Sequence, residues 1–109
     1  METAINLEAE AIKANDAFMS VHAKKYAKMK HNWDNAKKAC VKEGHSIRSL
    51  ARTSAYLSDS NYHCMADEMN KFLYVYFRNK PYELSEEQRL YCKAFVQLEM
   101  RRELESIFK

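Results

Sequence analysis

One glycine and one proline are all that this chain of 109 residues contains. Tight turns depend on these two residues, because glycine reaches positive φ angles and proline fixes φ at a value that many turns require. A sheet-rich domain of this length needs many such turns, so the chain is expected to form few and long elements. We therefore predict an all-α fold in which residues 1–109 form a single helical domain.

Three short segments divide the sequence into helices. Gly44 suits the end of one helix, and Ser46 can cap the start of the next. The segment SDSN at 58–61 carries side chains that compete for backbone hydrogen bonds. The single proline is followed by a possible capping box of Ser85 and Gln88. These segments predict about four helices, near residues 4–43, 47–57, 60–79 and 86–108.

The first predicted helix is long for so small a protein. Forty residues of helix span about 60 Å, whereas a compact domain of this size has a radius of gyration of about 13 Å. Asn15-Asp16 and the segment 32–35 are possible bends, but the apolar positions keep their helical phase through both. We therefore predict a continuous N-terminal helix. The run FLYVYF at 72–77 is apolar all round, which predicts the most buried turn of the third helix.

The last predicted helix carries apolar residues on two opposite sides. Such a helix needs two partners. The second side either contacts the long first helix or forms a seam between copies of the chain, and we expect a homo-oligomer. The first side contains Leu90, Tyr91, Ala94, Phe95 and Leu98, and the predicted seam contains Val96, Met100, Leu104 and Ile107.

Charge is distributed unevenly along the chain. Residues 13–42 hold eight lysines and two aspartates, a formal charge of +6, although the whole chain carries only +3. At about 100° per residue, the basic positions gather on one side of the first helix. Ala11, Phe18, Tyr26, Trp33 and Cys40 lie on or near the opposite side. The candidate partner-binding residues on the basic side are Lys13, Lys24, Lys28, His31, Lys38 and Lys42.

This basic side permits two functional interpretations and one structural one. It could dock on an acidic protein surface, or it could contact nucleic-acid phosphates without reading sequence. It could also serve only to keep a helix soluble, because lysine is a good helix former. The basic side contains no arginine, and its neighbouring aromatic residues point to the apolar side, away from any base. A membrane-surface role is set aside because the apolar side is needed for the core.

No residue pattern indicates catalysis, a cofactor or a metal. His63 and Cys64 are adjacent, but neighbours on a helix point about 100° apart and cannot share a proton well. Neither HxxxH nor ExxH occurs, and one glycine cannot make a glycine-rich phosphate loop. We therefore expect a protein that is not an enzyme and that has no cofactor or metal.

The cysteines and the apolar segments indicate the compartment. Cys40, Cys64 and Cys92 are odd in number and lack CxxC spacing, so we expect free thiols in a cytoplasmic protein. The chain starts with an acidic rather than an apolar segment, and no run approaches the roughly 18 apolar residues of a membrane span.

The leading hypothesis is a small regulatory, adaptor or inhibitor protein that docks on an acidic protein through its basic helix. The alternatives are an accessory protein that binds nucleic acid through the same lysines and an oligomeric helical sponge for a small anionic ligand. The composition, rich in Lys, Asn, Tyr and Met, is also common among phage accessory proteins.

Overall fold

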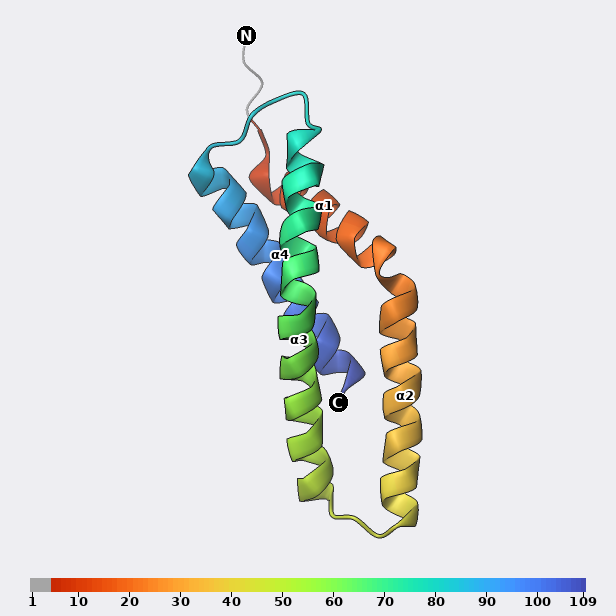
Figure 1. Cartoon of the computed structure of the whole chain (residues 1–109). Helices are drawn as coiled ribbons and strands as arrows, with labels where there is room; N and C mark the ends of the chain where they lie inside the picture. The colour runs from red at the N-terminus through yellow and green to blue at the C-terminus, as the bar shows by residue number, and fades with distance from the viewer. Residues whose placement is uncertain (1–4) are drawn as a thin grey trace.

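The computed structural model describes residues 5–109, and within this range all regular structure is helical. The prediction of an all-α bundle of about four helices is confirmed. The predicted helix start at residue 4 lies outside the described residues. The helices are α1 (Leu7–Val21), α2 (Ala23–Lys42), α3 (Ile47–Arg78) and α4 (Glu86–Ile107) (Figure 1).

The described part of the chain is elongated, with extents of 66 × 22 × 20 Å and a radius of gyration of 17.4 Å. A compact domain of this length would have a radius of gyration of about 13 Å. In Figure 1, α1 and α4 pack beside the second half of α3, whereas α2 and the first half of α3 extend away as an open hairpin. The core therefore occupies one part of the molecule.

Side chains from α1, α3 and α4 fill this core, and α2 adds two aromatic rings to it. The largest side chains that solvent does not reach come from these three helices. They are Phe18, Met65, Met69, Cys92, Val96, Met100 and Leu104.

The helix ends follow the sequence signals. Gly44 has a φ of 79°, the left-handed conformation that favours glycine after a helix. The Ser46 hydroxyl accepts a hydrogen bond from the backbone N–H of Ser49 at 3.2 Å. Ser85 and Gln88 form the predicted capping box at the start of α4. Local hydrogen bonding therefore decides where α2 ends and where α3 and α4 begin.

The prediction of one continuous N-terminal helix is wrong. The chain leaves helical geometry at His22, where φ is −100° and ψ is 10°, and α2 begins at the next residue. The His22 ring packs on Phe18 at 4.5 Å between centroids, and its Nδ1 lies 3.7 Å from a carboxylate oxygen of Glu68. No glycine or proline stands at this break, so we attribute it to packing: the bend lets α1 cross α4 while α2 runs along the molecule.

The predicted break at 58–61 is also wrong, because α3 is one helix of 32 residues. The polar side chains bond within the helix instead of interrupting it. The Asn61 amide donates to the carbonyl of Leu57 at 2.8 Å, one turn back. Asp59 accepts a hydrogen bond from Arg101 of α4 at 3.0 Å. Contact with another helix thus stabilises a segment that favours a turn by composition.

The segment 72–77 is helical as predicted, but it is not buried all round. Leu73 faces the core, whereas Tyr74 is 66% exposed and Val75 is 55% exposed. Only part of this turn meets α1 and α4, because no further helix among residues 5–109 covers its outer side.

Candidate binding surface

The strongest charge feature in the structure lies on α2. This helix carries seven lysines and one aspartate, a formal charge of +6. One side of it is exposed along its length. We call this side the lysine ridge, and it consists of Lys24, Lys28, His31, Lys38 and Lys42.

Two aromatic anchors fix the direction in which the ridge points. Trp33 is 3% exposed and packs edge-on against Phe108, with ring centroids 5.8 Å apart. Tyr26 is also buried, and its burial, together with the nearby Glu103, raises the pKa of its hydroxyl. Since both rings face the core, the lysine ridge on the opposite side of α2 must face solvent.

Only two lysines of α2 have carboxylate partners within 4.0 Å among residues 5–109. Lys25 pairs with Glu68 at 3.3 Å, and Lys37 pairs with Asp34 at 3.4 Å. The remaining lysines have no such partner in this part of the chain. They are Lys24, Lys28, Lys30, Lys38 and Lys42.

Lys30 was not among the residues that the sequence predicted for this surface. It is exposed, but it lies about 120° around α2 from Lys24, where it lines a small hollow with Tyr26 and Glu103. Lys30 shares with the ridge lysines only that it has no carboxylate partner within 4.0 Å among residues 5–109.

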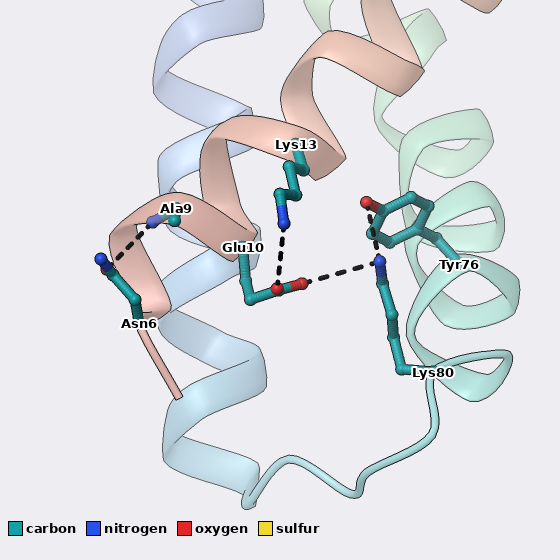
Figure 2. Close-up of polar contacts among 6 residues, drawn as sticks. All are labelled: Asn6, Ala9, Glu10, Lys13, Tyr76 and Lys80. Carbon is teal, nitrogen blue, oxygen red and sulfur yellow. Dashed lines mark hydrogen bonds and ion pairs between the residues drawn. The ribbon is translucent and has the colours of Figure 1, made fainter. Parts of the chain in front are cut away.

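Lys13, the remaining predicted member of this surface, does not lie on the same helix as the lysine ridge. Lys13 lies on α1, beyond the break at His22, and its Nζ is 3.8 Å from Oε1 of Glu10. Figure 2 shows that Glu10 also faces Lys80, at 3.6 Å from its Nζ. Lys13 therefore belongs to a polar cluster between α1 and the end of α3.

The middle of the lysine ridge carries no lysine but a contacting pair of side chains. His31 and Asn35 lie one turn apart, with Nε2 and Nδ2 separated by 3.2 Å. They occupy the space between Lys28 and Lys38, which are about 15 Å apart along the helix. The ridge lysines therefore form two groups, Lys24 with Lys28 and Lys38 with Lys42.

The predicted oligomer seam is wrong for the residues that were named. Val96, Met100 and Leu104 are 0% exposed and Ile107 is 5% exposed within the single chain. They pack against α1 and α3 in the core, so a second copy cannot reach them. The opposite side of α4 is the uncovered one, where Leu90, Tyr91 and Leu98 are 47–56% exposed.

The described residues provide no metal-binding group of three or more His, Cys, Asp or Glu side chains. The three cysteines carry free thiols. No helix between residues 5 and 109 has the length and apolar character needed to cross a membrane. No family model matches the chain, and neither the curated proteins nor the solved structures contain a match.

Proposed function

We propose that this chain is a small binding protein of the regulatory, adaptor or inhibitor type, and that it docks on an acidic protein surface through the lysine ridge. The observation that carries the proposal is the set of exposed α2 lysines that lack carboxylate partners in the described chain. Carboxylates on a partner would pair with these lysines, and the attraction between opposite charges would speed association at low salt.

Two features favour a protein over a nucleic acid as the partner. The aromatic rings of α2, Tyr26 and Trp33, are buried and cannot stack on bases. The ridge also contains lysine and no arginine, and arginine is better suited to bidentate phosphate recognition. The lysine ammonium acts as a point charge and requires no bidentate geometry, so carboxylates on an acidic protein surface can pair with it.

The test is zero-length carbodiimide cross-linking in a lysate of the native cell, because this reagent joins lysine amines to carboxylates in direct contact. We expect a protein to be joined through its Asp or Glu side chains to Lys28, Lys38 or Lys42. The product should be lost in a triple variant, Lys28→Glu with Lys38→Glu and Lys42→Glu.

A matched control changes three exposed cations of α3, by Arg48→Glu with Arg52→Glu and Lys71→Glu. This control should keep the cross-linked product, because its charge change is equal and lies off the ridge. Equal loss in both variants, or links only to other lysines, would refute the proposal.

A separate measurement tests whether the partner of the lysine ridge is a nucleic acid. Fluorescence anisotropy of labelled duplex DNA and single-stranded RNA is followed across a salt series. If the ridge binds phosphates, the slope of log K against log salt should fall by about three units in the triple variant. That result would replace the acidic protein by a nucleic acid as the partner.

A further inference from the structure

A hollow of about 870 Å³ lies between the end of α3, the loop at 79–85 and the start of α4. Its size falls within the range of small-molecule sites, roughly 300–1,000 Å³. It lies at the end of the molecule away from the turn at Gly44, where the α3–α4 loop runs in Figure 1. It is therefore separate from the lysine ridge.

The hollow has an apolar lining and one exposed aromatic ring. Leu73 is 6% exposed, and Phe77 and Leu84 are half-buried beside it. The Tyr74 ring also lines the hollow but is 66% exposed. An exposed aromatic ring next to an apolar lining offers a flat ligand a surface on which to stack.

Positive charge is in excess around this lining. Arg78, Arg89 and Lys93 line the hollow, and none has a carboxylate partner within 4.0 Å among residues 5–109. The guanidinium carbon of Arg78 lies 6.0 Å from the centroid of the Tyr74 ring. Glu83 is the acidic residue of the lining.

Lys80 also lines the hollow, but its ammonium group is already paired with Tyr76 and Glu10. Its Nζ donates to the Tyr76 hydroxyl at 3.2 Å and lies 3.6 Å from Oε2 of Glu10 (Figure 2). The two arginines and Lys93 are therefore the cations available to a ligand, and arginine is well suited to bidentate binding of phosphate or carboxylate.

We propose that this hollow binds a small organic anion that carries one flat ring, of the class of a nucleoside monophosphate. The ring stacks on Tyr74 over the apolar lining, and the anionic group is held by Arg89 and Lys93 with Arg78. The proposal does not depend on the function proposed for the lysine ridge, because the two sites share no residue.

Isothermal titration calorimetry with three probes separates the ring from the anion. The probes are adenosine monophosphate, adenosine and inorganic phosphate. Because both halves of the site are needed, adenosine monophosphate should bind at least tenfold more tightly than either other probe. Equal affinity for phosphate and adenosine monophosphate would refute the role of the ring, and no detectable binding of adenosine monophosphate at millimolar concentration would refute the site.

Paired variants locate the binding. Arg89→Gln with Lys93→Gln should weaken adenosine monophosphate binding at least tenfold, because two charge-assisted contacts are lost. Tyr74→Ala should weaken it about fivefold or more through the loss of stacking. The control is Arg48→Gln with Arg52→Gln, an exposed pair of cations four residues apart on α3.

The control variant should bind adenosine monophosphate with the same affinity as the unchanged protein. An equal loss of affinity in the control and in the Arg89 and Lys93 variant would show charge attraction without a site and would overturn the proposal. All of the changed side chains except Lys93, which is partly exposed, lie on the exposed surface. Circular dichroism of each variant confirms that the fold is retained.

Discussion

Glu10 joins the first helix to the end of the third. Its side chain is 13% exposed and lies 3.8 Å from Lys13 Nζ and 3.6 Å from Lys80 Nζ. The Tyr82 hydroxyl beside it, with Lys80 and Lys13, lowers the pKa of the Glu10 carboxyl. Burial and the carboxylate in turn raise the pKa of Tyr82 to about 12. The folded state therefore favours the ionised form of Glu10.

Replacing Glu10 by Gln should lower the free energy of unfolding by about 1 kcal/mol at pH 7. A lowered carboxyl pKa stabilises the fold fully above the unfolded value, near 4.5, and this contribution is lost as the pH falls through the folded value. The difference between the variant and the unchanged protein should therefore shrink as the pH falls below about 4.5. Urea unfolding of both proteins between pH 7 and pH values below 4.5 measures this difference in the free energy of unfolding.

Glu8→Gln is the control for this prediction. Glu8 also lies in the first turn of α1, so it shares the interaction with the helix dipole, but its side chain is exposed. Its replacement should cost less than that of Glu10 and should depend less on pH. An equal effect of both changes would show that the helix dipole, rather than the cluster with Lys80, is responsible.

Among the elements, α2 has the fewest contacts with the core. It is held mainly through Trp33 and Tyr26, which pack near the end of α4. The Trp33 ring meets the Phe108 ring there. Because few buried contacts hold it, α2 should open locally more easily than α1 or the second half of α3.

Truncating Phe108 to Ala should release α2 before the rest of the molecule. The free energy of unfolding should fall by roughly 3 kcal/mol, the cost of a large core truncation. Hydrogen exchange should accelerate more in residues 23–42 than in residues 7–21. The control is Phe95→Ala, a half-buried ring earlier in α4. Equal acceleration in α1 and α2 would contradict a separate attachment of α2.

At the scale of the whole molecule, one side of α4 is not covered by the other described helices. We predict that two copies of the chain associate through this side. Leu90, Ala94 and Leu98 lie along it at helical spacing and are exposed. An antiparallel pairing of two copies about Ala94 sets Leu98 opposite Leu90. The same pairing sets Glu87 near the start of one helix opposite Arg101 near the end of the other, although Arg101 also bonds Asp59 of α3 within its own chain.

Light scattering after size exclusion tests this association. At high concentration we expect about twice the chain mass of 12.9 kDa. Tyr91→Glu with Leu98→Glu should restore the single-chain mass, because it buries like charges in the pairing. The control, Tyr56→Glu with Ile47→Glu, changes exposed residues of the same kinds on α3 and should not do so. A constant mass of 12.9 kDa at all concentrations would refute the association.

The helix class, three of the helix boundaries and the orientation of α2 follow from the sequence alone. Gly44, Ser46 and Ser85 act through the conformation and hydrogen bonds of their own turn, so neighbouring residues suffice to predict them. The lysine ridge likewise follows from the helical period, because Trp33 and the ridge lysines lie on opposite sides of any continuous helix that contains them.

The tertiary structure decided what depends on contacts between distant segments. The break at His22 involves Phe18 and Glu68, and no local breaker marks it. Both sides of α4 are apolar, so its periodicity could not select the side that α1 and α3 bury. The hollow lies between two helices and a loop, and its lining becomes a group only when α3 and α4 fold back on each other. Periodicity describes one helix at a time, whereas burial depends on which helices meet.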